Sequence, residues 1–213
     1  MDISTQINEL AASTFEEIQR IEKEYHDAEE KRKETPQRTG WVDAAYQAKA
    51  MKAEAEYLAA KDAYNSMRRN LPGKALDQLA AIRREYVKAV GQQFAVDPKQ
   101  IDANALELLR SGIMKASEYS SMMENAKIQG NYTMVRLIAR YAADAAEEIS
   151  KKYGEGDPRA RELRAVSYFG NKDPEADKLG TFDNLTEIFR RTVNNSAMIS
   201  YWGELATPFL EML

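Results

Sequence analysis

The chain contains one histidine and no cysteine, so few catalytic arrangements are open to it. His26 stands between Tyr25 and Asp27 in a segment of helical periodicity. A Ser-His-Asp triad would have to use this histidine, but the sequence has no Gly-x-Ser-x-Gly turn to present a nucleophilic serine. A di-metal site in a helical bundle needs Glu-x-x-His from two helices, and a zinc site needs more nitrogen or sulfur ligands than one histidine supplies. We therefore expect His26 to be exposed and non-catalytic.

Three carboxylates, Asp144, Glu147 and Glu148, gather on one predicted helix. Carboxylate oxygens are the ligands that magnesium and calcium prefer. The same spacing is typical of a solvated helix face, which is the interpretation we adopt. The sequence also lacks a glycine-rich phosphate-binding loop of either common form. We therefore expect no catalytic residue, no metal and no cofactor, and predict that the protein is not an enzyme.

Arginines at helical spacing form the strongest basic motif of the chain. Arg159, Arg161 and Arg164 follow the Asp157-Pro158 helix start, and both guanidinium groups and a helix N-terminus favour phosphate. However, Glu162 lies among them, and the whole chain carries a formal charge of −4 with a pI near 5.3. A broad electrostatic grip on nucleic acid or anionic lipid is therefore not expected. Nucleic-acid contact through these arginines stays the alternative to surface ion pairing.

The elements that would position such residues are helices, and the clearest one runs from Trp41 to Leu71. Its apolar residues recur at alternating steps of three and four, which is the period of an α-helix. An inner stripe lies on one side: Tyr46, Ala50, Ala53, Tyr57, Ala60, Tyr64, Met67 and Leu71. An outer stripe lies beside it: Trp41, Ala44, Ala48, Met51, Ala55 and Leu58. A helix with two apolar surfaces can pack between two neighbours.

Two further helices are expected to pack against this one. The first runs from Ser4 or Thr5 to Glu34, and a turn containing Pro36 and Gly40 joins it to the central helix. We expect Leu71-Pro72-Gly73 to end the central helix, and a third helix to cover residues 74–94. Residues 1–96 are thus predicted to form a long antiparallel helical hairpin with a third helix, similar to a coiled-coil bundle.

The pattern changes at Asp97-Pro98, a helix-start signal that precedes shorter helices. Glycine and proline divide the rest of the chain into predicted helices over residues 102–111, 116–129, 131–153, 158–169 and 182–206. A polar connection is expected over residues 171–180. No stretch alternates with period two for long enough to predict a strand. The sequence therefore predicts an all-α protein with a compact helical domain over residues 97–213.

One segment of this second half resembles small uncharacterised helical proteins of bacterial prophages. The resemblance rests on Leu108–Tyr141, where Leu-Leu-Arg-Ser-Gly-Ile-Met precedes Glu118-Tyr119 and Asn-Tyr-Thr-Met-Val-Arg-Leu-Ile. It carries no catalytic motif. Such proteins are assumed to serve virion assembly or host takeover, so the resemblance implies a phage or mobile-element origin rather than a particular activity.

The last five residues are unusually apolar for the end of a chain. Phe209, Leu210, Met212 and Leu213 follow Pro208, whereas a solvated tail is normally polar and frayed. They either fold back onto the second domain or dock as a short anchor on another chain. Both alternatives predict that these side chains are covered.

Together these features favour a non-enzymatic protein-interaction or assembly protein. Trp41, Met51 and Leu58 of the outer stripe, together with the apolar tail, are the candidate contact residues. We expect protein partners, including further copies of the chain, because a three-helix unit does not cover both stripes. The N-terminal residues lack the pattern of a signal peptide, and no apolar run is long enough to cross a bilayer, so a cytoplasmic location is expected. A nucleic-acid-associated helical regulator is the second hypothesis.

Overall fold

The structure is a computed structural model that describes residues 2–36, 43–172 and 174–213. Every regular element in these ranges is a helix, which confirms the predicted all-α class. The α-helices are α1 (Ile3–Glu34), α2 (Ala44–Gln93), α3 (Ala103–Ser111), α4 (Ala116–Ile128), α5 (Tyr132–Tyr153), α6 (Pro158–Asn171), α7 (Pro174–Asn194) and α8 (Trp202–Leu210). Two 3₁₀-helices, η1 (Pro98–Gln100) and η2 (Ser196–Tyr201), lie between them.

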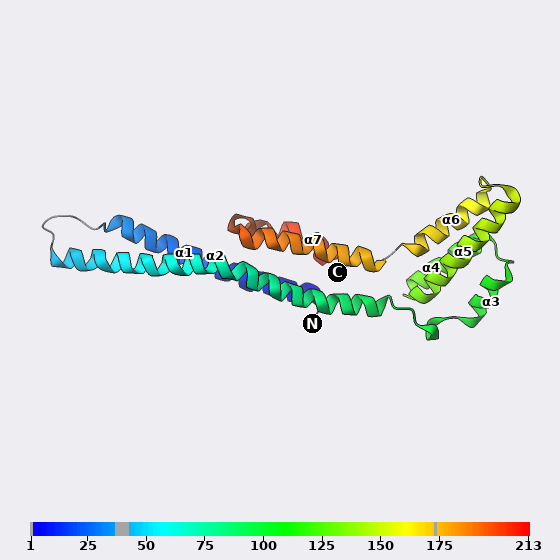
Figure 1. Cartoon of the computed structure of the whole chain (residues 1–213), viewed down its shortest axis with the longest axis horizontal. Coiled ribbons are helices and arrows are strands. Elements are labelled where there is room, and N and C mark those ends of the chain that lie inside the picture. The colour runs from blue at the N-terminus through cyan, green and yellow to red at the C-terminus, as the bar shows by residue number, and fades with distance from the viewer. Residues whose placement is uncertain (1, 37–42, 173) are drawn as a thin grey trace. The chain divides into compact units, whose positions relative to one another are not determined.

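The first two helices run antiparallel, as their side-chain contacts require. Tyr25 stacks on Tyr64 with ring centroids 4.8 Å apart, whereas Arg32, further along α1, lies over Tyr57 at 4.0 Å. A later residue of α1 therefore contacts an earlier residue of α2, which is the pattern of two antiparallel helices. The inner stripe supplies this contact, since Ala50, Ala53, Tyr57 and Met67 are all buried. Figure 1 shows the two ribbons side by side.

The predicted helix break at Leu71-Pro72-Gly73 is wrong. α2 continues for 50 residues through Pro72, so the expected second and third helices are one element. Proline removes one backbone hydrogen bond and normally bends or ends a helix. Here Pro72 is buried, and Ile18 of α1 and Val193 of α7 line the same small cavity beside it. Packing on both sides thus offsets the intrinsic preference of proline to end the helix.

The described chain forms two compact units, and the first is made of Met1–Val87 together with Lys178–Leu213. Its core brings helices from both ends of the chain together. Phe15 of α1 lies 6.0 Å from Phe189 of α7 and 5.4 Å from Trp202 of α8, measured between ring centroids. Tyr86 of α2 stacks on Phe182 of α7 at 5.3 Å. The core of the first unit therefore includes the C-terminal helices as well as α1 and α2.

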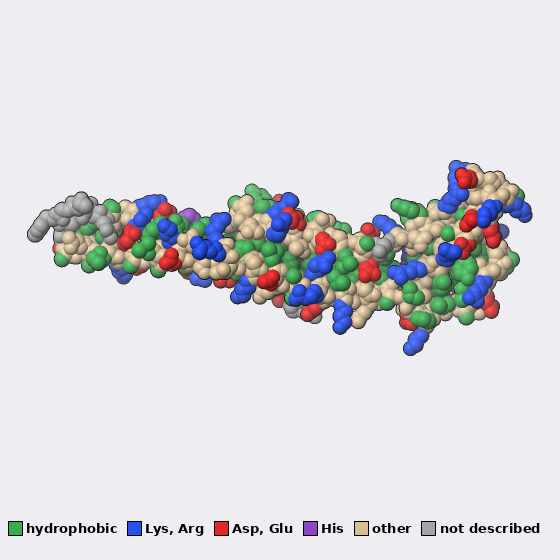
Figure 2. Space-filling model, in the orientation of Figure 1, with side chains coloured by type: hydrophobic (Ala, Val, Ile, Leu, Met, Phe, Trp, Pro, Cys, Tyr) green, Lys and Arg blue, Asp and Glu red, His purple; other side chains and the backbone are tan. Residues whose placement is uncertain are grey.

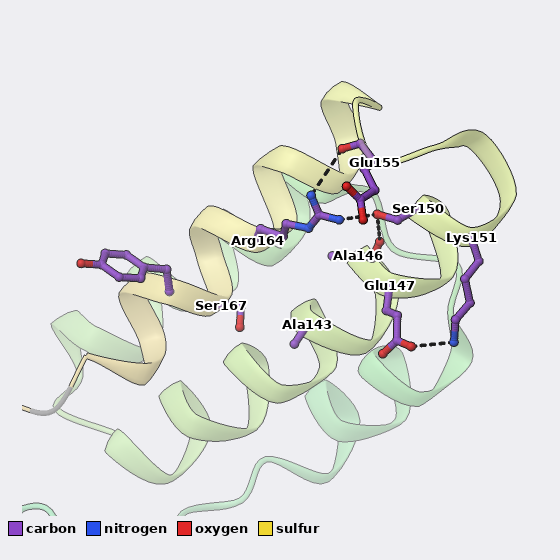
Figure 3. A pocket seen from close by; sticks show the side chains of 9 residues that line it. Ala143, Ala146, Glu147, Ser150, Lys151, Glu155, Arg164 and Ser167 are labelled. Carbon is purple, nitrogen blue, oxygen red and sulfur yellow. Dashed lines mark hydrogen bonds and ion pairs between the residues drawn. The ribbon is translucent and has the colours of Figure 1, made fainter.

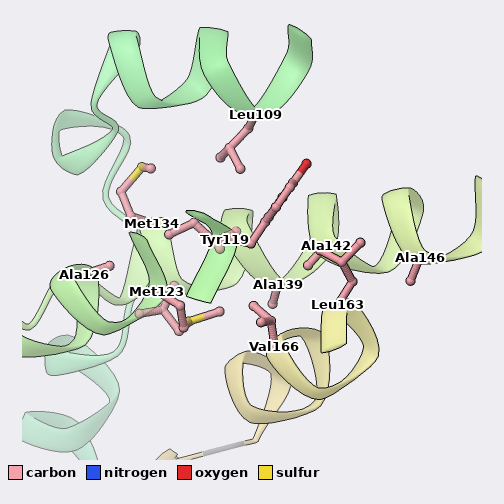
Figure 4. Packing of buried hydrophobic residues seen from close by; sticks show 12 residues of the cluster. Leu109, Tyr119, Met123, Ala126, Met134, Ala139, Ala142, Ala146, Leu163 and Val166 are labelled. Atoms are coloured by element: carbon pink, nitrogen blue, oxygen red, sulfur yellow. The ribbon is translucent and has the colours of Figure 1, made fainter. Parts of the chain in front are cut away.

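The second unit, Lys88–Asp177, is built around α5. One face of α5 carries small buried residues, including Ala139, Ala142 and Ala146, so neighbouring helices pack close to its backbone. α4 and α6 lie on this face and contribute Tyr119, Met123, Leu163 and Val166, while α3 contributes Leu109 (Figure 4). The helix predicted over residues 131–153 is thus the central one of this unit.

This grouping differs from the predicted domains 1–96 and 97–213. Lys178–Leu213 belongs to the same unit as residues 1–87, and the apolar face of α7, with Phe182, Leu185 and Phe189, is completely buried there.

Several helix ends also differ from the prediction. α7 already begins at Pro174, so the expected polar connection over 171–180 is mostly helical. Gly170 lies inside α6 instead of ending it. Pro208 likewise lies inside α8, as Pro72 does in α2.

Candidate functional site

The outer stripe of α2 is exposed along its whole described length. Met51 and Leu58 are 68% and 50% exposed, and Ala44, Ala48 and Ala55 are exposed as well. Trp41, the remaining member of the stripe, lies outside the described residues. The contacts that α2 makes with α1 use the inner stripe, so the outer stripe faces away from these contacts. The outer stripe is therefore a continuous apolar helix face that the described part of the chain leaves uncovered.

Charged residues beside the outer stripe are paired within the hairpin. Arg32 and Lys31 of α1 lie 3.8 Å and 3.6 Å from carboxylate oxygens of Glu54 and Glu56, and Lys52 lies 3.9 Å from Glu56. These pairs are partly exposed, so each adds little stability. On the face that Figure 2 shows, basic and acidic side chains are interspersed. The ion pairs beside the outer stripe thus combine charges of both signs.

The apolar tail folds back onto the first unit. The hydroxyl of Ser4 donates a hydrogen bond of 2.8 Å to the carbonyl of Leu210, and the ammonium of Lys178 donates one of 2.9 Å to the carbonyl of Leu213. Phe209, Leu210 and Leu213 are half-buried, whereas Met212 is exposed. The tail thus packs within its own chain, against α1 and against α7 of the predicted second domain over residues 97–213. Met212 is not covered, which differs from what both alternatives predicted.

The three candidate arginines of α6 do not converge on one site. The Arg159 guanidinium binds both carboxylate oxygens of Asp157, at 3.0 Å and 2.8 Å. Arg164 donates to the hydroxyl of Ser150 at 2.8 Å and to the carbonyl of Glu155 at 3.3 Å. Arg161 is exposed and makes no ion pair with a residue that the structure describes. Two of the three are thus engaged within the chain.

Asp157, the ion-pair partner of Arg159, is also the N-cap residue of α6. Its carboxylate caps α6 by accepting a hydrogen bond of 2.8 Å from the backbone N–H of Arg159. The Arg159 side chain, with help from this backbone bond, lowers the pKa of Asp157 to about 2. Negative charge at a helix N-terminus is also favoured by the helix dipole. The pair therefore stabilises the first turn of α6.

An open cavity of about 600 Å³ lies beside α5 and α6 and contains Arg164 (Figure 3). Its charged side chains are Glu147, Lys151, Glu155 and Arg164, two of each sign. Lys151 pairs with Glu147 at 2.6 Å, which lowers the pKa of that carboxylate. In Figure 3, Arg164 points towards its partners Ser150 and Glu155. Lys151 and Glu147 thus neutralise each other, and Arg164 is held by a hydroxyl and a backbone carbonyl of the same chain.

Of the residues considered for catalysis or metal binding, Glu147 lines the first cavity, whereas His26 and Asp144 do not. His26 is exposed, and its Nδ1 is 4.0 Å from a carboxylate oxygen of Glu29. Asp144 pairs with Arg140 at 3.2 Å on the same helix. Among the described residues no group of three or more His, Asp and Glu side chains is placed to hold a metal ion.

A second cavity, of about 570 Å³, was not predicted from the sequence. It brings together residues far apart in the chain, among them Phe94, Lys127, Arg136 and Phe169. Each of the two basic residues occupies a position typical of a solvated helix face. The only local signal was the aromatic character of Phe94 and Phe169 near helix ends, which does not indicate that they meet.

Within the described ranges, the helices include none that is long and apolar enough to span a membrane. No family model, no curated protein and no solved structure matches the chain.

Proposed function

We propose that this protein is a non-enzymatic assembly protein that pairs with a second copy of itself through the outer stripe of α2. The observation that carries the proposal is the exposure of Met51 and Leu58 on a regular apolar face. Contiguous exposed apolar surface of this kind typically marks a protein-interaction site. In this view α1 and α2 form an antiparallel coiled-coil-like hairpin, with one stripe used within the chain and the other between chains.

A second copy fits this surface for two reasons. Residues 44–62 contain three basic and three acidic residues and so carry no net charge, which disfavours nucleic acid or anionic lipid as the occupant. The stripe is also complementary to itself when two helices run antiparallel. Met51 then faces Ala55 of the partner subunit, and Ala48 faces Leu58 of the partner subunit. Alternating large and small side chains let helices interdigitate, and a twofold axis repeats each contact.

The proposed biological setting is a phage or mobile element. The resemblance of residues Leu108–Tyr141 of this chain to prophage proteins supports a role in virion assembly or host takeover. A chain without cysteine suits the reducing cytoplasm, where we place this assembly.

Light scattering at tens of micromolar tests the proposal. We expect the wild-type chain to be a dimer and the double variant Met51→Glu/Leu58→Glu to be a monomer, because four charges per dimer would be buried without partners. The matched control is Ile128→Glu, which introduces the same charge at an apolar residue that is 83% exposed on α4. This variant should remain dimeric. A monomeric wild-type chain would refute the proposal, as would dissociation by the control alone.

A further inference from the structure

The second cavity of the Lys88–Asp177 unit has aromatic walls. Phe94, which is 2% exposed, meets Tyr132 edge to face, with ring centroids 4.4 Å apart. Phe169 lines the same cavity but is 58% exposed, so its ring is available for a new contact. A volume of about 570 Å³ lies within the range of pockets that hold small ligands.

The charged residues of this cavity are not balanced. Its lining includes Lys127, Arg136, Lys172 and a single acid, Asp177. Asp177 pairs with Lys172 at 3.2 Å. Lys127 donates only to the carbonyl of Phe169, at 3.4 Å, and its ammonium lies 5.9 Å from that ring. Arg136 is exposed and has no ion-pair partner within the described part of the chain. Lys127 and Arg136 therefore leave positive charge beside aromatic surface.

The contrast with the first cavity supports a ligand. There, Lys151 and Arg164 have partners within the chain, and acids and bases are equal in number. Here, Lys127, Arg136 and an exposed ring line one cavity, and its one acid, Asp177, pairs with Lys172. Guanidinium and ammonium groups bind phosphate, and aromatic rings stack on flat rings such as nucleobases.

We propose that this cavity binds a small anion that carries a flat aromatic group, of the nucleoside monophosphate class. The phosphate lies against Arg136 and Lys127, and the base lies against Phe169. This site is separate from the outer stripe, so its occupancy does not depend on self-association.

Calorimetric titration of the full-length chain with AMP tests the inference, with inorganic phosphate and adenosine as separate probes. We expect AMP to bind more tightly than either probe, because only AMP uses both the cations and the ring. Arg136→Gln and Phe169→Ala should each weaken AMP binding, the former by about tenfold or more since it removes a charged hydrogen-bond donor. The matched control is Arg140→Gln, one turn away on α5 and already paired with Asp144.

Circular dichroism establishes that each variant is folded, and Lys127→Gln replaces Arg136→Gln if the latter is not. The inference is overturned if AMP does not bind at several millimolar. It is equally overturned if phosphate alone binds as tightly as AMP, or if the Arg140→Gln variant loses as much affinity as Arg136→Gln.

Discussion

At the scale of single residues, Gly170 shows how closely the helices of the second unit approach. A Cβ atom at this position would lie 2.4 Å from the methyl carbon of Met123, 2.6 Å from Cβ of Ala139 and 3.3 Å from the carbonyl oxygen of Val135. The methionine end can move, but the alanine Cβ is bonded directly to the backbone of α5 and the carbonyl is part of that backbone. Glycine is therefore required here by packing, not by a special backbone conformation.

Gly170→Ala is consequently expected to destabilise the protein by about 1–2 kcal/mol. Overpacking of this kind typically costs about 1–3 kcal/mol, and the better helix propensity of alanine offsets part of it. Urea denaturation followed by circular dichroism measures the change. Gly180→Ala in α7 is the matched control, since a Cβ there meets nothing within 4 Å and should add roughly 0.5–1 kcal/mol of stability. Equal effects at both positions would contradict the packing argument.

At the scale of an element, the start of α6 depends on the charge of Asp157. Its carboxylate accepts hydrogen bonds from the backbone and side chain of Arg159, and these hold its pKa at about 2 in the folded chain. An unfolded aspartate titrates near pH 3.9, so the unfolded chain takes up the proton first as the pH falls. The stability that this carboxylate contributes is thus complete above about pH 4 and is lost as the pH falls through about 2.

Asp157→Asn should therefore lower the melting temperature at neutral pH, and the difference from wild type should shrink between about pH 4 and pH 2.5. Asparagine keeps an oxygen that can cap the helix, so the variant removes the charge and not the cap. Thermal melts at a series of pH values measure the difference. If it stays constant down to pH 2.5, the folded-state pKa of Asp157 is not depressed as described.

At the scale of the whole molecule, both ends of the chain build one unit. Lys178–Leu213 packs with Met1–Val87, so the chain leaves this unit after Val87 and returns to it at Lys178. The backbone between α2 and α3 is mostly non-helical around Ala95 to Asp102, which makes it the natural place for a protease to cut.

A single cut near Val96 should leave the two fragments associated, because the C-terminal fragment still carries α7 and α8 packed on α1 and α2. Limited proteolysis followed by gel filtration under native conditions tests this, with denaturing electrophoresis to show that the cut is complete. Two independent domains divided at residues 96 and 97 would instead separate after the cut. If the two fragments co-elute under native conditions and separate only in urea, the result supports a first unit that both fragments share.

The sequence by itself determined the helical class, most helix starts and the two faces of α2. These follow from local physics: apolar side chains recur with the helical period, and Asp102, Asn131 and Asp157 satisfy free backbone N–H groups where the helices predicted over 102–111, 131–153 and 158–169 begin. The sequence also predicted Met51 and Leu58 as contact residues, and both side chains are exposed.

Only the tertiary structure decided where helices continue and which segments share a core. Pro72 and Pro208 are local helix breakers, but each lies inside a helix, and at Pro72 the packing of α1 and α7 retains the helical backbone. The return of α7 to the first unit depends on Phe15, Phe189 and Trp202 meeting across most of the chain length. Such contacts join residues that no local pattern relates, and the same is true of Lys127, Arg136 and Phe169 around the second cavity.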